Sequence, residues 1–167
     1  MTAISKVRTR EGAGRHDLYE EAESIALIAL APRAKSRGEL FTHLKKRGVA
    51  EDVANAVLYR LQEQGLIDDE AFARAWSESR QRTKRLSKRV IAGELREKGV
   101  GSEIIEIVCS EIDQGAEYAM ALEMATRKHR PIAHLDSELI RRRVHGALAR
   151  RGFASSVING VMREIGI

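Results

Sequence analysis

The chain has 167 residues, enough to bury a core of its own, and a formal net charge of +5 at pH 7. Charged residues make up 32% of it and aromatic residues 4%, and there are 2 prolines, a composition that argues against a sheet protein and favours an all-α one. It contains no apolar run of about 18 residues and no charged-then-apolar leader, so neither a membrane span nor a secretory signal is predicted. A single cysteine, Cys109, rules out an internal disulfide, and we expect a cytoplasmic protein.

The first third of the sequence predicts a loosely ordered tail followed by three helices. Residues 1–17 mix Arg, Gly and Ser and form the tail, and the first helix covers residues 18–31. The second helix begins at the capping-box sequence Ser36-Arg37-Gly38-Glu39 and ends at Gly48, because glycine readily adopts the left-handed conformation of a helix terminus. The third covers residues 51–64, with apolar residues at helical spacing on one face.

A sharp corner is predicted after Gly65. Asp68 is placed to cap a fourth helix that runs to Arg82, and Asp69 and Glu70 add negative charge to its first turn, where the helix dipole favours it. Three acids in a row could also suggest a magnesium site. Because capping accounts for all three, we interpret them as helix-terminal residues.

Five further helices follow the same pattern of caps and terminal glycines. We expect them at 88–98, 102–113, 116–129, 137–151 and 155–165. The prediction therefore contains about nine helices, with a break at Pro131.

A phrase repeated three times organises these helices. It reads Leu44-Lys45-Lys46-Arg47-Gly48-Val49, then Leu95-Arg96-Glu97-Lys98-Gly99-Val100, then Leu148-Ala149-Arg150-Arg151-Gly152-Phe153, with the glycines 51 and 53 residues apart. A period of this length suits three helices per unit. We predict three-helix modules at 18–67, 68–114 and 115–167, forming an elongated, curved array with right-angled corners that presents a surface rather than a catalytic pocket.

Two glycines inside predicted helices, Gly93 and Gly146, each lie six residues before a terminal glycine. A glycine within a helix costs about 1 kcal/mol relative to alanine. Their matching positions predict a close approach of helices within each module.

No catalytic or metal-binding constellation is found. The sequence lacks a phosphate-binding loop, paired cysteines and a His-Glu-x-x-His helix. His129 and His134 flank Pro131 without acidic or cysteine partners nearby, so we interpret them as solvated. Trp76 is interpreted as a packing residue and Cys109 as a buried, unreactive thiol. We expect neither an enzyme nor a cofactor or metal.

Clusters of basic residues are the candidate binding sites. Six Lys or Arg residues and no acid lie between positions 80 and 89, at a predicted junction between helices where capping does not require them. They favour contact with phosphate or with an acidic protein surface, and the absence of aromatic residues argues against stacking on single-stranded bases. The candidate contact residues are Arg80, Arg82, Lys84, Arg85, Lys88, Arg89, Arg141, Arg142, Arg143, Lys45 and Lys46.

Two functions are compatible with these features. One is a modular helical regulator that binds a large protein or nucleoprotein surface along its length. The other is a helix-turn-helix transcription regulator that reads base edges with one recognition helix. Because the basic residues are spread over three modules, the first is favoured. A steep salt dependence without sequence preference would support it, and a strong preference for one operator would support the second.

The same strings resemble the RecX family of bacterial recombinase regulators. The resemblance rests on Ser36-Arg37-Gly38-Glu39-Leu40, on Gly65-Leu66-Ile67-Asp68-Asp69-Glu70-Ala71-Phe72-Ala73, on Val90-Ile91-Ala92-Gly93-Glu94-Leu95-Arg96-Glu97-Lys98-Gly99-Val100, and on the repeated phrase. Together they cover residues 22–165.

This resemblance implies a non-enzymatic modulator of the RecA recombinase in homologous recombination, DNA repair and the SOS response. Members of the family are similar in using tandem three-helix modules that lie in the groove of the RecA–DNA filament. The implied partners are the RecA filament and DNA, the latter mainly through its backbone, and the implied state is a monomer without a membrane partner. Binding would inhibit or modulate ATP hydrolysis, strand exchange and filament assembly.

Overall fold

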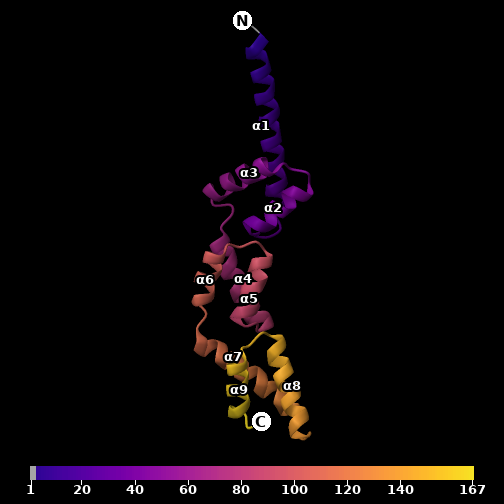
Figure 1. Cartoon of the computed structure of the whole chain (residues 1–167), viewed down its shortest axis with the longest axis vertical. Helices are drawn as coiled ribbons and strands as arrows, with labels where there is room; N and C mark the ends of the chain where they lie inside the picture. Colours follow the sequence, from indigo (N-terminus) through magenta and orange to yellow (C-terminus); the bar gives the residue numbers. More distant parts are fainter. Residues whose placement is uncertain (1–2) are drawn as a thin grey trace. The chain divides into compact units, whose positions relative to one another are not determined.

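The computed structural model describes the backbone of residues 3–167 and the solvent exposure of Gly14 and residues 16–167. Within that part the chain is all-α, as predicted, with nine α-helices, one short 3-10 helix and no strand (Figure 1). In chain order these are α1 (Ala3–Leu30), α2 (Arg37–Lys46), α3 (Glu51–Glu63), α4 (Asp69–Lys84), α5 (Lys88–Glu97), α6 (Ser102–Ser110), α7 (Gln114–His129), η1 (Arg130–Ile132), α8 (Ser137–Arg150) and α9 (Ser155–Glu164).

The predicted helices agree with the observed ones except at a few ends. Helix α1 begins at Ala3 rather than at Leu18. The tail predicted at residues 1–17 falls largely where side chains lie outside the described residues, and it stays a prediction. Helix α6 ends at Ser110, three residues early, and the predicted break at Pro131 is the short helix η1.

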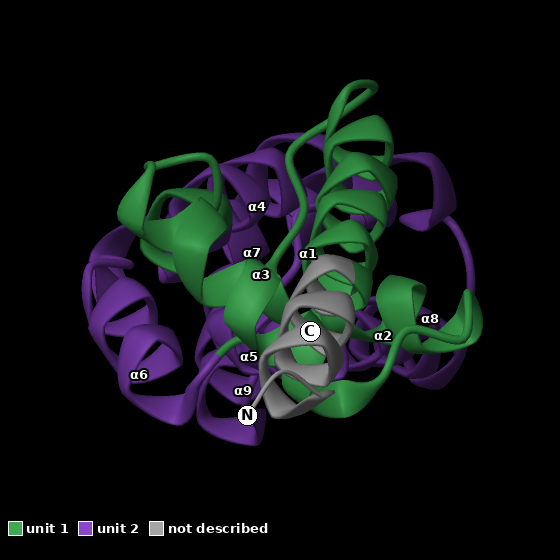
Figure 2. Ribbon diagram, turned by 90° about the horizontal axis from the view of Figure 1, so that it is seen from above, with its two compact units in different colours: residues 1–72, 98–100 green, residues 73–97, 101–167 purple. Residues whose placement is uncertain are grey.

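The chain divides into two compact units, residues 1–72 with 98–100 and residues 73–97 with 101–167 (Figure 2). In unit 1, α1, α2 and α3 enclose one core. Leu40 and Leu44 of α2 and Leu58 of α3 are fully buried there, against the small side chains of Ala22 and Ala26 on α1. The alanines, one turn apart on one face of α1, let the larger leucines fill the space between the helices.

Unit 2 contains a second core built in the same way. Ala121 and Ala125 of α7 are buried against Val144 and Leu148 of α8 and against the apolar face of α9. Helices α4, α5 and α6 bury a further set of side chains: Ala73, Ile91, Leu95, Ile105 and Val108. The apolar face predicted for the helix at residues 51–64 is buried in the core of unit 1.

The predicted terminal glycines Gly48, Gly65, Gly99 and Gly152 all have positive φ angles. The predicted close approach at Gly93 is wrong, because a β-carbon there would meet no atom within 4 Å. At Gly146 a β-carbon would meet only the flexible end of the Arg150 side chain. Close approaches lie instead at Gly38, which meets the backbone of Gly99, and at Gly152, which meets the side chain of Val90.

Candidate binding surfaces

A joint in unit 1 connects the start of α2 to the turn that follows α5. The Ser36 hydroxyl caps α2 by accepting from the amide of Glu39 at 3.0 Å, and it donates to the backbone carbonyl of Lys98. Glu39 completes the predicted capping box by accepting from the Ser36 amide at 3.4 Å. Ser36 is fully buried, so the helix cap and the tertiary contact depend on the same side chain.

Charged residues surround this joint. The Glu39 carboxylate accepts from Lys98 Nζ at 2.8 Å and from Arg33 at 3.1 Å. Burial by itself would raise the pKa of Glu39, but its bonds to Arg33 and Lys98 outweigh that effect and hold the pKa at about 2. Lys98 also lies over the Phe72 ring, 5.9 Å from its centroid. Lys98 therefore contacts both Glu39 and Phe72 at this joint.

The acidic corner at residues 68–70 has two separate capping roles. Asp68 Oδ1 accepts from the amides of Glu70 and Ala71, both at 2.9 Å, and caps α4 as predicted. Asp69 instead accepts from the amide of Arg37, the first residue of α2, at 2.7 Å. Burial raises the pKa of Asp69, and the bond to Arg37 partly offsets this. Asp69 and Glu70 lie in the first turn of α4, as predicted, and Asp69 has the additional role of capping α2.

Unit 2 repeats the joint between the start of α5 and the turn after α8. The amide of Ser87 donates to the carbonyl of Arg151 at 3.0 Å, and Glu117 of α7 accepts from the amide of Lys88, the first residue of α5, at 3.0 Å. Arg89 Nε donates to the carbonyl of Gly152 at 3.3 Å. Asp69 and Glu117 thus each accept from the amide of the first residue of a helix, α2 or α5. In both units the turn at the repeated glycine contacts the start of that helix.

Three of the six residues of the predicted cluster at positions 80–89, namely Arg80, Arg85 and Arg89, form contacts within unit 2. Arg80 Nε lies 2.6 Å from Glu94 Oε2, and its guanidinium lies 3.8 Å from the centre of the Trp76 ring. The same Glu94 oxygen accepts from Trp76 Nε1 at 2.8 Å. Arg85 pairs with Glu123 of α7 at 2.7 Å. Sequence reasoning missed these partners because the acids lie 14 and 38 residues away along the chain.

The remaining cluster residues face solvent. Arg82 and Lys84 are exposed at the end of α4, and Lys88 is half-buried at the start of α5; none has an ion-pair partner among the described residues. Arg141, Arg142 and Arg143 are likewise exposed on α8, and Lys45 and Lys46 are exposed at the end of α2 in unit 1.

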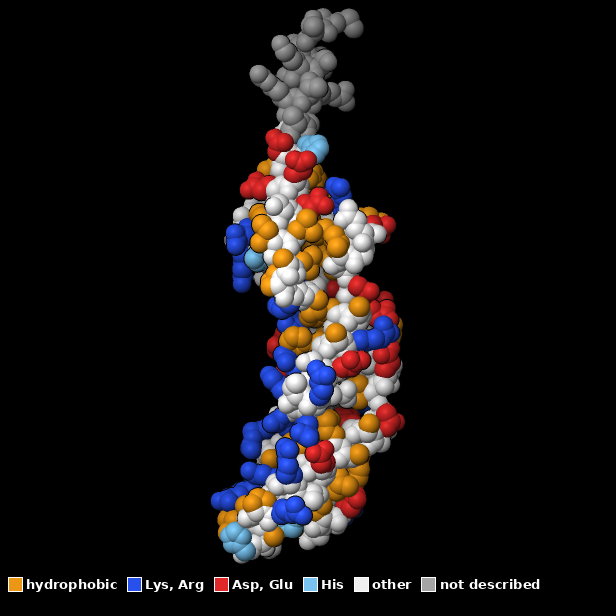
Figure 3. All heavy atoms as spheres, turned by 180° about the vertical axis from the view of Figure 1, so that it is seen from behind, with side chains coloured by type: hydrophobic (Ala, Val, Ile, Leu, Met, Phe, Trp, Pro, Cys, Tyr) orange, Lys and Arg blue, Asp and Glu red, His pale blue; other side chains and the backbone are white. Residues whose placement is uncertain are grey.

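The unit 2 joint adds two residues that the sequence reasoning left off its candidate list. Because Ser87 and Arg89 contact the turn after α8, Arg150 and Arg151 lie beside the start of α5. The signal available in the sequence is the repeated phrase, which places a basic residue, Arg47, Lys98 or Arg151, directly before each terminal glycine. Figure 3 shows Lys and Arg side chains gathered on the side of unit 2 where α8 lies, with acidic side chains gathered where α6 lies.

Other potentially reactive groups have structural explanations. Cys109 is half-buried rather than buried as predicted, and partial burial raises the pKa of its thiol, which suits an unreactive cysteine. Among the described residues, no group of three or more His, Cys, Asp or Glu side chains could hold a metal ion. No helix in the described part of the chain is long and apolar enough to cross a membrane.

Comparison with known families and proteins gives consistent matches over most of the chain. Residues 22–61, 68–108 and 116–162 match the family models for the first, second and third three-helix domains of RecX. Regulatory protein RecX of Streptomyces coelicolor is 38% identical over 162 residues, covering 97% of this chain and 86% of the relative. Its counterpart in Mycobacterium avium is 42% identical over 139 residues, covering 83% of this chain and 80% of the relative.

Two solved structures share the fold. RecX from Lactobacillus salivarius superimposes with a TM-score of 0.81 at 19% identity, covering 89% of this chain and 97% of that one. A second crystal structure, of regulatory protein RecX, also has a TM-score of 0.81, at 22% identity, covering 93% of this chain and 77% of the other.

Proposed function

This chain belongs to the RecX family, and we propose that it binds the RecA recombinase filament and the DNA within it. It acts without catalysis, as a cytoplasmic monomer, and lowers or modulates ATP hydrolysis, strand exchange and filament assembly. Its three modules, residues 18–67, 68–114 and 115–167, each present part of the contact surface.

The exposed basic surface of unit 2 carries this proposal. We define it by six residues that end or begin helices or lie on α8: Arg82, Lys84, Lys88, Arg141, Arg142 and Arg143. Cations without internal partners suit phosphate oxygens. The Trp76 ring already contacts Arg80 and Glu94, which favours recognition of the nucleic-acid backbone over stacking on bases.

The arrangement favours a regulator over a helix-turn-helix transcription factor. A recognition helix collects base-reading side chains at its own N-terminal end. Here the exposed cations are divided among α4, α5 and α8. Binding that favours one filament conformation shifts the filament between states and thereby changes its activity.

The test measures DNA-dependent RecA ATPase, strand exchange and co-sedimentation with filaments, using substoichiometric amounts of the full chain. We expect inhibition by the wild-type chain and a clear loss of it in Arg82→Glu/Lys84→Glu. The matched control, Arg127→Glu/Lys128→Glu, makes the same charge change at exposed residues of α7 outside the proposed surface. No effect of the wild-type chain on any of the three readouts would refute the proposal.

DNA binding alone separates the two functions. The slope of log affinity against log salt is negative, and each lost phosphate contact should reduce its magnitude by about 0.9. The double reversal should therefore reduce the magnitude by about 2 on any DNA sequence. A strong preference for a single operator would instead support the transcription regulator.

A further inference from the structure

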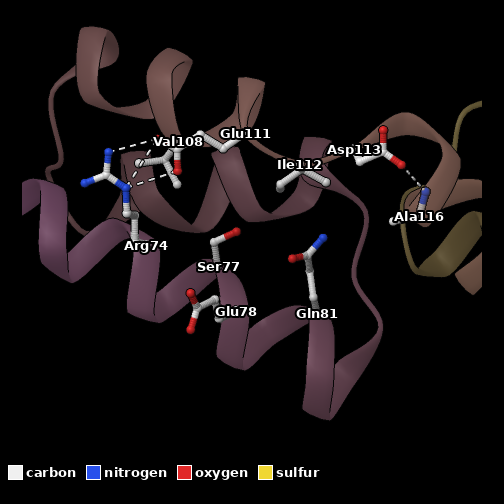
Figure 4. A pocket seen from close by; sticks show the side chains of 9 residues that line it. All are labelled: Arg74, Ser77, Glu78, Gln81, Val108, Glu111, Ile112, Asp113 and Ala116. Carbon is white, nitrogen blue, oxygen red and sulfur yellow. Dashed lines mark hydrogen bonds and ion pairs between the residues drawn. The ribbon is translucent and has the colours of Figure 1, made fainter.

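A pocket in unit 2 lies between α4, α6 and the start of α7, on the acidic side of the unit (Figure 4). Its volume is about 370 Å³, within the range of about 300–1,000 Å³ typical of pockets for small ligands. Six polar residues line it: Arg74, Ser77, Glu78, Gln81, Glu111 and Asp113. None of them belongs to the basic surface described above.

The charge in this pocket is negative. Among the lining residues Arg74 is the one cation, and Glu111 binds it in a bidentate pair, with Nη2–Oε1 and Nε–Oε2 distances of 2.8 and 3.1 Å. This pair lowers the pKa of Glu111. Glu78 is exposed and has no cationic partner among the described residues, and Asp113 uses Oδ2 alone, to cap α7 at Ala116. Two carboxylates therefore remain without a balancing cation.

Ser77 is the second, independent feature. Its side chain points from α4 toward α6, as Figure 4 shows, and the residue is 4% exposed. Its hydroxyl forms no hydrogen bond within the described part of the chain. Among the described residues, every side-chain N or O atom that is sealed from solvent has a hydrogen-bond partner. The Ser77 hydroxyl has no partner, so it is not sealed from solvent, and it opens into the pocket that Ser77 lines.

Comparison of the three domains shows that this hydroxyl is not required for packing. The first helix of each domain buries two small residues four positions apart. These are Ala22 and Ala26 on α1, Ala73 and Ser77 on α4, and Ala121 and Ala125 on α7. Ser77 thus provides an acceptor where the other two domains have a methyl group.

We propose that this pocket binds the guanidinium group of an arginine side chain presented by a protein partner. A guanidinium carries five donors in a planar fork, which suits acceptors at several separate positions such as Glu78, Asp113 and Ser77. The negative charge disfavours the binding of DNA phosphate on this side of unit 2. This deepens and rests on the proposed function, because it assigns the acidic side to the recombinase and the basic surface to DNA.

The pocket itself can be tested without any recombinase. The full chain, labelled with ¹⁵N, is titrated with N-acetyl-arginine amide, and the neutral isostere N-acetyl-citrulline amide serves as the control probe. We expect saturable shifts confined to the amides around Ser77, Gln81 and Asp113 for the arginine probe, and none for citrulline. Equal shifts with both probes, or shifts spread over the surface, would overturn the proposal.

The second experiment measures co-sedimentation with RecA filaments. Glu78→Lys places a competing cation at the pocket, so filament affinity should fall by about tenfold, while affinity for DNA alone should not fall. Glu106→Lys makes the same charge change at an exposed position of α6 that does not line the pocket, and should leave filament affinity within about twofold.

These two experiments distinguish failure of the pocket from failure of the proposed function. If the arginine probe binds but the wild-type chain does not bind filaments, the function fails and the pocket remains a site for arginine from another protein. If filaments bind but the probe does not, or if both lysine variants bind filaments equally well, the pocket proposal fails and the function stands.

Discussion

Gly38 and Gly99 pack backbone against backbone within unit 1. A β-carbon on Gly38 would lie 2.6 Å from the Cα of Gly99 and 2.7 Å from the carbonyl oxygen of Lys98. Neither neighbour is a flexible side chain that could move aside. The hydrogen bond from Ser36 to Lys98 and the capping of α2 by Asp69 both lie next to this contact.

We therefore predict that Gly38→Ala destabilises the protein although it lies in a helix. Alanine favours a helix over glycine by about 1 kcal/mol. Overpacking costs up to about 3 kcal/mol, and backbone neighbours that cannot move aside place this site at that upper end, so the net loss should be about 2 kcal/mol. Urea unfolding followed by circular dichroism measures it. Gly93→Ala is the control, because a β-carbon there meets nothing within 4 Å, and it should stabilise the protein. Equal effects of the two substitutions would contradict the close packing.

The second prediction concerns the loss of stability in acid. Glu39 has a pKa of about 2 in the folded chain because Arg33 and Lys98 donate to its carboxylate, despite the opposing effect of burial. A carboxyl group whose pKa is lower in the folded state stabilises the fold above its ordinary pKa, and this contribution disappears as the pH falls through the folded value. The stabilising contribution of Glu39 is therefore lost as the pH falls from about 5 to about 2.

Glu39→Gln should consequently cost about 1–2 kcal/mol near pH 6, after allowance for screening by solvent, and almost nothing near pH 2. Unfolding by urea across this pH range gives the difference. Glu63→Gln controls for the change in net charge, because Glu63 is exposed and has no ion-pair partner among the described residues. A difference between wild type and Glu39→Gln that is independent of pH would show that the carboxylate does not carry the effect.

The third prediction concerns Arg85, whose φ of 50° is left-handed although it is not glycine. This conformation costs a non-glycine residue about 1–2 kcal/mol. Arg85→Gly and Arg85→Ala both lose the ion pair with Glu123, so the difference between them reports the backbone alone. We expect the glycine variant to be more stable than the alanine variant by about 1 kcal/mol in urea unfolding. The reverse order would show that the left-handed conformation is not a source of strain.

Much of the fold follows from local sequence signals. Ser36 and Asp68 cap helices as their spacing predicts, and Gly48 ends α2 in the left-handed conformation. These signals act within a few residues along the chain, so they can be read without knowing the tertiary structure.

The partners of the candidate binding residues could not be read in this way. Glu94 and Glu123 neutralise Arg80 and Arg85 across helices, and Asp69 caps a helix that begins 32 residues earlier. Such contacts depend on how helices pack, which a run of like charges does not reveal. The sequence identified the basic residues, but it could not distinguish the cations that form ion pairs within unit 2 from those that are exposed to solvent.

The last prediction tests the joint in unit 2 by comparing two glycines with nearly equal φ angles, 82° at Gly152 and 84° at Gly48. A β-carbon at Gly48 meets no atom within 4 Å, so Gly48→Ala should cost only the left-handed penalty of about 1–2 kcal/mol. At Gly152 the same carbon would clash with Val90 Cγ2 and lie 2.7 Å from Ser87 Oγ. Gly152→Ala should therefore cost more, by about 1–3 kcal/mol.

A double substitution separates packing from backbone strain. Val90→Ala removes the clashing methyl groups, so in the Gly152→Ala background it should restore part of the lost stability, whereas in the Gly48→Ala background it should not. Urea midpoints of wild type, Val90→Ala, Gly152→Ala and the Val90→Ala/Gly152→Ala double variant give the coupling between positions 90 and 152. The same set with Gly48→Ala is the control. If Val90→Ala lowers the stability of both backgrounds equally, Gly152 serves the end of α8 alone. If it rescues only the Gly152 variant, the repeated glycine holds the start of α5 against the turn after α8.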